Sequence, residues 1–126
     1  MRVRTRARAK DEMREQRIAM EAVVDAYDSS ERAMGWYYYL HDKMKAPFKA
    51  RCRFARPISV LKVKEEVEVL GMASEEECNS EMLVRVRRAG ERMAAPLAQL
   101  QPLSKDQETQ EGVGDWLYWV DRGYEL

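Results

Sequence analysis

Carboxylates are the side chains of this sequence with the clearest capacity for chemistry, and they gather in two regions. A polar stretch between two predicted strands contains Glu75, Glu76, Glu77, Asn79 and Glu81. A predicted helical region contributes three aspartates near helix ends: Asp25, Asp28 and Asp42. Calcium binds about six to eight oxygen atoms from carboxylates, carbonyl groups and water. A loop can turn two consecutive glutamates and its own carbonyl groups onto one ion, which makes these residues candidate calcium ligands.

The alternative is that these carboxylates are solvated surface groups, because charged side chains mostly stay exposed. No EF-hand pattern is present. Asp28 also has a competing role, since Asp28-Ser-Ser-Glu31 has the form of a capping box, in which the first side chain accepts from an amide three residues on. From the residues alone, both interpretations remain open.

Other catalytic or metal-binding arrangements are poorly represented. The chain has one histidine, His41, and its two cysteines, Cys52 and Cys78, lack the spacing of a zinc site. The sequence contains no Gly-rich phosphate loop, GxSxG elbow or HExxH motif. We therefore expect that the protein is not an enzyme. Cys52 falls on the apolar side of an alternating segment, which predicts a buried, reduced thiol.

Two features could serve a partner instead of an ion. The aromatic run Trp36–Tyr39 is predicted to pack in a helical core, although such rings can also stack on nucleic-acid bases. Residues 1–17 carry an excess of basic side chains, and we expect residues 1–10 to form a mobile basic arm. The formal net charge of the whole chain is zero, whereas a dedicated nucleic-acid binder normally carries a basic excess.

The elements that must position these residues follow from length and periodicity. A chain of 126 residues, 45% of them apolar, predicts one domain, here residues 11–126. No apolar run is long enough to cross a membrane, and the basic start lacks the apolar stretch of a secretory signal. We therefore expect a cytoplasmic protein that does not bind membranes.

Helices are predicted at both ends of this domain. Residues 11–27 and 29–44 form a helical region, and Pro47 ends it. The first helix is expected to bury one apolar side: Met13, Met20, Val23, Val24 and Tyr27. A C-terminal helix is predicted over residues 105–123, with a capping box at Ser104 and a possible break at Gly112 and Gly114.

Residues 48–100 alternate apolar and polar side chains in four short segments, which indicates strands buried on one face. The fold class predicted is therefore α+β, with a small SH3-like antiparallel β-barrel or meander packed against the helices. In a meander, the acidic strand at Glu66 and Glu68 lies between basic strands, so opposite charges face each other. The segment Pro96–Leu100 is expected to form a single helical turn.

Several stretches in a fixed order form a recognisable pattern. The pattern begins with Tyr27-Asp28-x-x-Glu31-Arg32-Ala33-x-Gly35-Trp36-Tyr37-Tyr38-Tyr39-Leu40 and Pro47-Phe48. It continues with Leu61-Lys62-Val63, Glu66-Val67-Glu68-Val69-x-Gly71-Met72-Ala73, Glu77-Cys78 and Pro96-Leu97-x-Gln99-Leu100. It ends with Glu108-Thr109-Gln110 and Asp115-Trp116-x-Tyr118-Trp119-Val120-x-x-Gly123-Tyr124. Over about residues 20–126, the chain thus resembles the cyanobacterial-type calcium-binding protein family known as CcbP.

The resemblance implies an intracellular protein that binds calcium without an EF-hand, as a buffer or a sensor. Carried over by position, its ligands would come from the acidic loop and the helical aspartates: Asp25, Asp28, Asp42, Glu75, Glu76, Glu77 and Glu81. The alternative function is a non-catalytic interaction module whose basic arm contacts a protein or nucleic acid.

Overall fold

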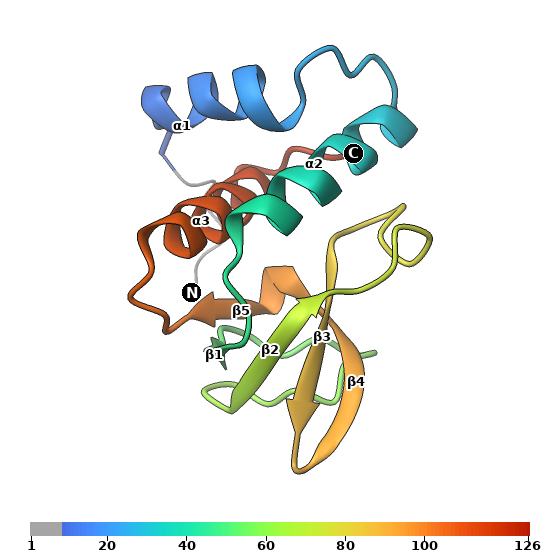
Figure 1. Cartoon of the computed structure of the whole chain (residues 1–126), viewed down its shortest axis with the longest axis vertical. Helices are drawn as coiled ribbons and strands as arrows, with labels where there is room; N and C mark the ends of the chain where they lie inside the picture. Colours follow the sequence, from blue (N-terminus) through green and yellow to red (C-terminus); the bar gives the residue numbers. More distant parts are fainter. Residues whose placement is uncertain (1–8) are drawn as a thin grey trace.

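The computed structural model describes residues 9–126 and places helices over one side of an antiparallel sheet (Figure 1). Residues 1–8, which hold most of the predicted basic arm, lie outside the described residues. The helical elements are α1 (Glu12–Arg17), the π-helical turn η1 (Ile18–Ala22), α2 (Ser29–Lys43), the 3₁₀ turn η2 (Leu97–Gln99) and α3 (Gln107–Asp121). The strands are β1 (Phe48–Cys52), β2 (Glu66–Met72), β3 (Leu83–Arg88), β4 (Glu91–Pro96) and β5 (Leu100–Pro102).

The N-terminal helix is shorter than predicted, and it buries a different face. The α-helix ends at Arg17, continues as η1 and stops at Ala22, where the sequence predicted one helix to Tyr27. Its buried apolar residues are Ile18 and Ala22. The predicted buried face is wrong for Met13, Met20, Val24 and Tyr27, which are all exposed, whereas Val23 packs partly buried against the core. A short helix that crosses another at one point needs only a narrow apolar contact, so its remaining apolar side chains face solvent.

Helix α2 begins as the capping pattern predicted. The Asp28 side chain accepts from the Glu31 amide at 2.8 Å, while the Glu31 carboxylate accepts from the Tyr27 amide at 2.8 Å. Further along the helix, Trp36 and Tyr39 are buried. The prediction of core packing is confirmed for these two rings, since large aromatic side chains contribute most to core burial.

The sheet has the order β4-β3-β2-β1-β5, and every pair is antiparallel. The acidic strand β2 lies between the basic strands β1 and β3, as the meander predicted. Arg51 pairs with Glu66 at 2.9 Å, and Arg87 pairs with Glu68 at 2.7 Å. These two cross-strand pairs match opposite charges within the sheet.

The predicted closed SH3-like barrel is not confirmed. Strands β4 and β5 stand at opposite edges, and no ladder joins them within residues 9–126. The predicted helical turn is present as η2, whose Leu97 is buried. Strand β5 follows η2 directly and pairs with β1. The sequence did not predict β5.

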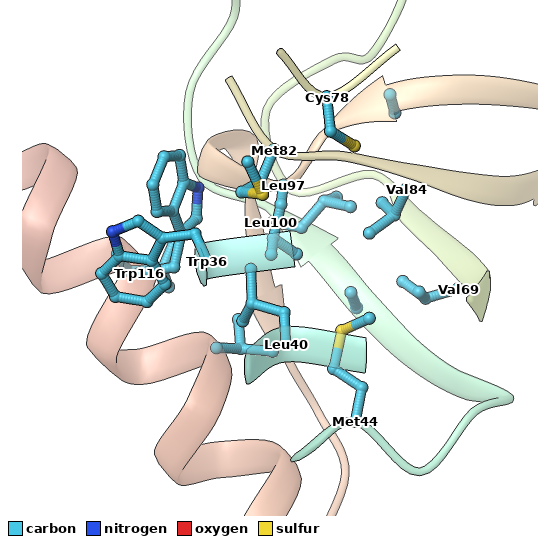
Figure 2. Packing of buried hydrophobic residues seen from close by; sticks show 14 of the residues in the cluster. Trp36, Leu40, Met44, Val69, Cys78, Met82, Val84, Leu97, Leu100 and Trp116 are labelled. Carbon is cyan, nitrogen blue, oxygen red and sulfur yellow. The ribbon is translucent and has the colours of Figure 1, made fainter. Parts of the chain in front are cut away.

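The core joins the helices to the inner face of the sheet (Figure 2). Trp36 and Trp116 meet edge to face with their ring centres 5.1 Å apart. Leu40 of α2 and Met44, the C-cap residue of this helix, are buried, and Figure 2 shows them in the cluster that also contains Val69 of β2 and Leu100. These contacts fix the orientation of α2 over the sheet.

Helix α3 runs unbroken through Gly112 and Gly114, contrary to the predicted break. An added Cβ at Gly112 would lie 2.5 Å from the Lys43 Cβ atom, and one at Gly114 would lie 2.9 Å from the Arg14 guanidinium. The glycines therefore allow close packing. The N-cap is Asp106, whose side chain accepts from an amide in the first turn, and not the predicted Ser104.

A buried carboxylate attaches α1 to α3. Asp115 is fully buried and accepts from Arg14 at 2.6 Å, from Arg17 at 2.7 and 2.8 Å, and from the Tyr39 hydroxyl at 2.7 Å. Arg14 and Arg17 are thus committed to the fold. They do not contribute the free basic surface that the nucleic-acid alternative requires.

Candidate functional site

The acidic stretch after β2 forms a closed turn. The Cys78 amide donates to the Ser74 and Glu75 carbonyl oxygens at 3.2 and 3.1 Å. The Ser74 hydroxyl accepts from the Glu77 amide at 3.2 Å, and the Glu77 carboxylate accepts from the Ser74 amide at 3.1 Å. This reciprocal pair has the form of a capping box. The spacing Ser74-x-x-Glu77 in the sequence could have predicted it.

The three consecutive glutamates of this turn have different surroundings. Glu77 also accepts from Arg85 of β3 at 2.6 Å. Hydrogen bonds from the Ser74 amide and hydroxyl, with help from Arg85, lower the pKa of Glu77. Glu75 accepts from the Tyr38 hydroxyl at 2.5 Å. Glu76 is exposed and has no hydrogen bond or ion pair among the described residues.

Helix α2 holds the turn through two adjacent tyrosines. The Tyr37 hydroxyl donates to the Ala73 carbonyl oxygen at 3.0 Å, and the Tyr38 hydroxyl reaches Glu75. The hydrogen bond to the Glu75 carboxylate raises the pKa of Tyr38. The exposed side of the aromatic run therefore positions the acidic turn, a role that the sequence did not predict.

Glu81, at the end of the same loop, is held by an arginine. Both of its carboxylate oxygens accept from Arg56, at 2.9 and 3.1 Å. Such a two-point arrangement fixes the carboxylate in position. Glu81 therefore points to the loop between β1 and β2, and its pairing partner lies 25 residues away in sequence.

The three predicted aspartates lie in the turn before α2, at its N-cap and near its C-terminal end. Asp25 occupies the turn between η1 and α2, with a φ angle of 58°. Asp28 is the N-cap of α2, so its side chain is already used. Asp42 is exposed near the end of α2, and its carboxylate lies 3.7 Å from the His41 imidazole.

The donor chemistry of the acidic turn fits calcium, because carboxylates and turn carbonyl groups are the oxygen ligands that calcium prefers. The ligands are not pre-assembled, however. Within residues 9–126, no three Asp, Glu, His or Cys side chains are placed to hold one metal ion. Two glutamates of the turn would have to leave Tyr38 and Arg85 before they could share an ion.

Cys78 connects the end of the turn to the first residue of β3. Its thiol donates to the Leu83 carbonyl oxygen at 3.4 Å and accepts from the Leu83 amide at 3.3 Å. Burial raises the pKa of Cys78, and burial likewise raises that of Cys52. Both cysteines are free and buried, so the predicted buried thiol at Cys52 is confirmed.

Comparison with known proteins identifies the class of this protein. A family model described as calcium binding, Calci_bind_CcbP, matches residues 16–120. The chain belongs to the CcbP family of calcium-binding proteins. The sequence-based resemblance to this family is thereby confirmed.

Two solved structures are similar to this chain over nearly its whole length. One is described as the crystal structure of Anabaena CcbP, with 43% identity, a TM-score of 0.82, and coverage of 94% of this chain and 97% of that chain. The other is a calcium-binding protein in the calcium-binding form, with 42% identity, a TM-score of 0.82, and coverage of 93% and 96%. No curated protein matches the sequence. Among the described residues, no helix combines the length and apolar character needed to cross a membrane.

Proposed function

We propose that this CcbP-family protein takes calcium at the turn Ser74–Cys78, with Glu75 and Glu76 as the first carboxylates to engage the ion. The observation that carries this proposal is the row of three glutamates on one exposed turn, in a chain of a calcium-binding family. Carbonyl oxygens of the turn and water would complete the coordination.

In this proposal, some of the remaining predicted ligands contribute to calcium binding and others keep a structural role. Glu77 joins the ion only after it leaves Arg85, and Asp42 adds negative charge from the side of α2 that carries Tyr38. Asp25 adds negative charge from the η1–α2 turn. Asp28 and Glu81 keep their structural roles, because capping and the two-point contact with Arg56 already use them.

Calorimetry tests the site directly. The double variant Glu75→Gln/Glu76→Gln removes two charges from the turn, and we expect calcium affinity to fall by at least about tenfold, since affinity follows ligand charge. The matched control is Glu12→Gln/Glu91→Gln, which removes two exposed carboxylates outside the turn. Equal calcium affinity in both double variants would show that the site is not at this turn. Asp42→Asn then asks separately whether α2 supplies a ligand.

The role in the cell is either a calcium buffer or a calcium sensor, in the cytoplasm. Two buried free thiols are typical of a reducing compartment. A buffer only needs to bind the ion, whereas a sensor must also recognise another molecule. Calcium-dependent binding of a protein partner would define a sensor.

A further inference from the structure

Apolar side chains that the core does not use are exposed along η1, the turn after it and α2. Met20 is 66% exposed, Val24 51% and Tyr38 48%. Met34, one turn before Tyr38 on α2, is also exposed. Val24 and Tyr38 line the same groove, and a contiguous exposed apolar surface can mark an interaction site. Methionine in particular adapts its shape to different partners.

Between η1 and α2 lies a groove of about 380 Å³. Its lining includes Ala22, Val24, Gly35 and Tyr38. An added Cβ at Gly35 would lie 2.3 Å from the Ala22 carbonyl oxygen, so glycine is what allows η1 to approach α2 here. A second hollow, on the outer face of α1 and η1, includes Met13 and Met20. Glu21 lines both hollows, so they lie next to each other on the N-terminal helices.

The groove is acidic at its rim. Two carboxylates line it, Glu21 and Asp42. The two cations that line the hollows are already paired. Lys43 contacts Glu111 at 2.6 Å, and Arg17 is held by Asp115. An apolar centre with a negative rim is complementary to a basic, amphipathic ligand.

We propose that this groove binds a short, basic, amphipathic segment of a partner protein. An apolar side chain of the partner fits between Val24 and Tyr38, and its lysine or arginine side chains approach Glu21 and Asp42. Helix-in-groove recognition of this kind uses apolar anchors at helical spacing together with complementary charge. The proposal stands on the groove alone. The groove adjoins the proposed calcium turn, because the Tyr38 hydroxyl donates to Glu75.

The test uses the full chain and a fluorescein-labelled 14-residue peptide of leucine and lysine at helical spacing, in the presence of EDTA. We expect saturable binding, seen as a rise in fluorescence anisotropy, and none with the matching leucine–glutamate peptide. Val24→Lys should weaken binding by at least about tenfold, because it puts a cation where the basic peptide must dock. Ile58→Lys is the matched control, since Ile58 is also an exposed apolar residue but lies on the β1–β2 loop.

Three results would overturn the proposal. The first is no saturable binding, and the second is equal weakening by Val24→Lys and Ile58→Lys. The third is concentration-dependent self-association in sedimentation that Val24→Lys abolishes, since the groove would then bind a second copy of this chain. Glu75→Gln should leave peptide binding in EDTA intact, so failure of the calcium site and failure of the groove give different results. A melting curve for each variant checks that it folds.

Discussion

Replacement of Arg85 by glutamine should strengthen calcium binding. Arg85 contacts Glu77 at 2.6 Å, and the side chains are 45% and 36% exposed. In the proposed site, Glu77 must leave this arginine before it can reach the ion. The arginine therefore competes with calcium for the same carboxylate, and its removal leaves Glu77 free to bind.

The size of this effect follows from two contributions. Breaking an exposed ion pair of this kind shifts an equilibrium by about 1.5- to 5-fold. Repulsion between a guanidinium and a divalent ion at about 7 Å in water weakens calcium affinity by less than about tenfold, and salt screens this repulsion further. We therefore expect Arg85→Gln to lower the Kd for calcium by about three- to tenfold at low salt, with a smaller gain at high salt.

Calorimetric titration at two salt concentrations measures this gain, and Arg87→Gln is its control. Arg87 lies on the same strand and pairs with Glu68 at 2.7 Å, away from the acidic turn. Its replacement changes the net charge identically. If Arg85→Gln leaves the Kd unchanged, Arg85 and calcium do not compete for Glu77. If both variants gain equally, only overall charge matters, and the proposed exchange of partners is refuted.

Three further predictions concern the fold. Asp115→Asn should lower the free energy of unfolding in urea by about 3 kcal/mol, the lower end of the cost of breaking a buried pair, because both arginines stay partly exposed; a loss below about 1 kcal/mol would contradict this. Burial alone would raise the pKa of Glu15, but hydrogen bonds from Tyr118 and Tyr124 outweigh it and lower the pKa below its ordinary 4.5. The charged form thus stabilises the fold above pH 4.5, and the melting temperature should fall as the pH drops below that value, less steeply in Glu15→Gln. Cys52 and Cys78 should react with a thiol reagent far more slowly in the native protein than in urea; equal rates would contradict their burial.

Local periodicity was enough to predict the strands and the charge pairing between them. Alternation places Phe48, Ala50 and Cys52 on the buried face of β1, and the structure has the same burial. Because opposite charges favour cross-strand pairing, the acidic strand was also predicted to lie between the two basic ones. Strand β5 escaped prediction because three residues, one of them proline, carry no periodic signal.

The N-terminal helix could not be predicted in the same way. Its apolar residues have helical spacing, but Met20 and Val24 face solvent while Ile18 faces the core. What attaches the helix is Asp115, about a hundred residues later, and no local pattern reports a contact over that separation. In the candidate site, too, only the local features could be predicted from the sequence. The acidic turn was visible in the sequence, whereas the arginine that neutralises Glu77 comes from the facing strand.

The attachment of α1 to α3 also sets the order in which the chain can assemble on the ribosome. Arg14 and Asp115 are 101 positions apart, so α1 has no acceptor until almost the whole chain has been made. At about 5–20 residues per second, that delay lasts about 5–20 s. A helix of six residues is not stable in water by itself. Arg14 therefore lacks its buried carboxylate partner until α3 has been made, although η1 can already pack on α2 at Gly35.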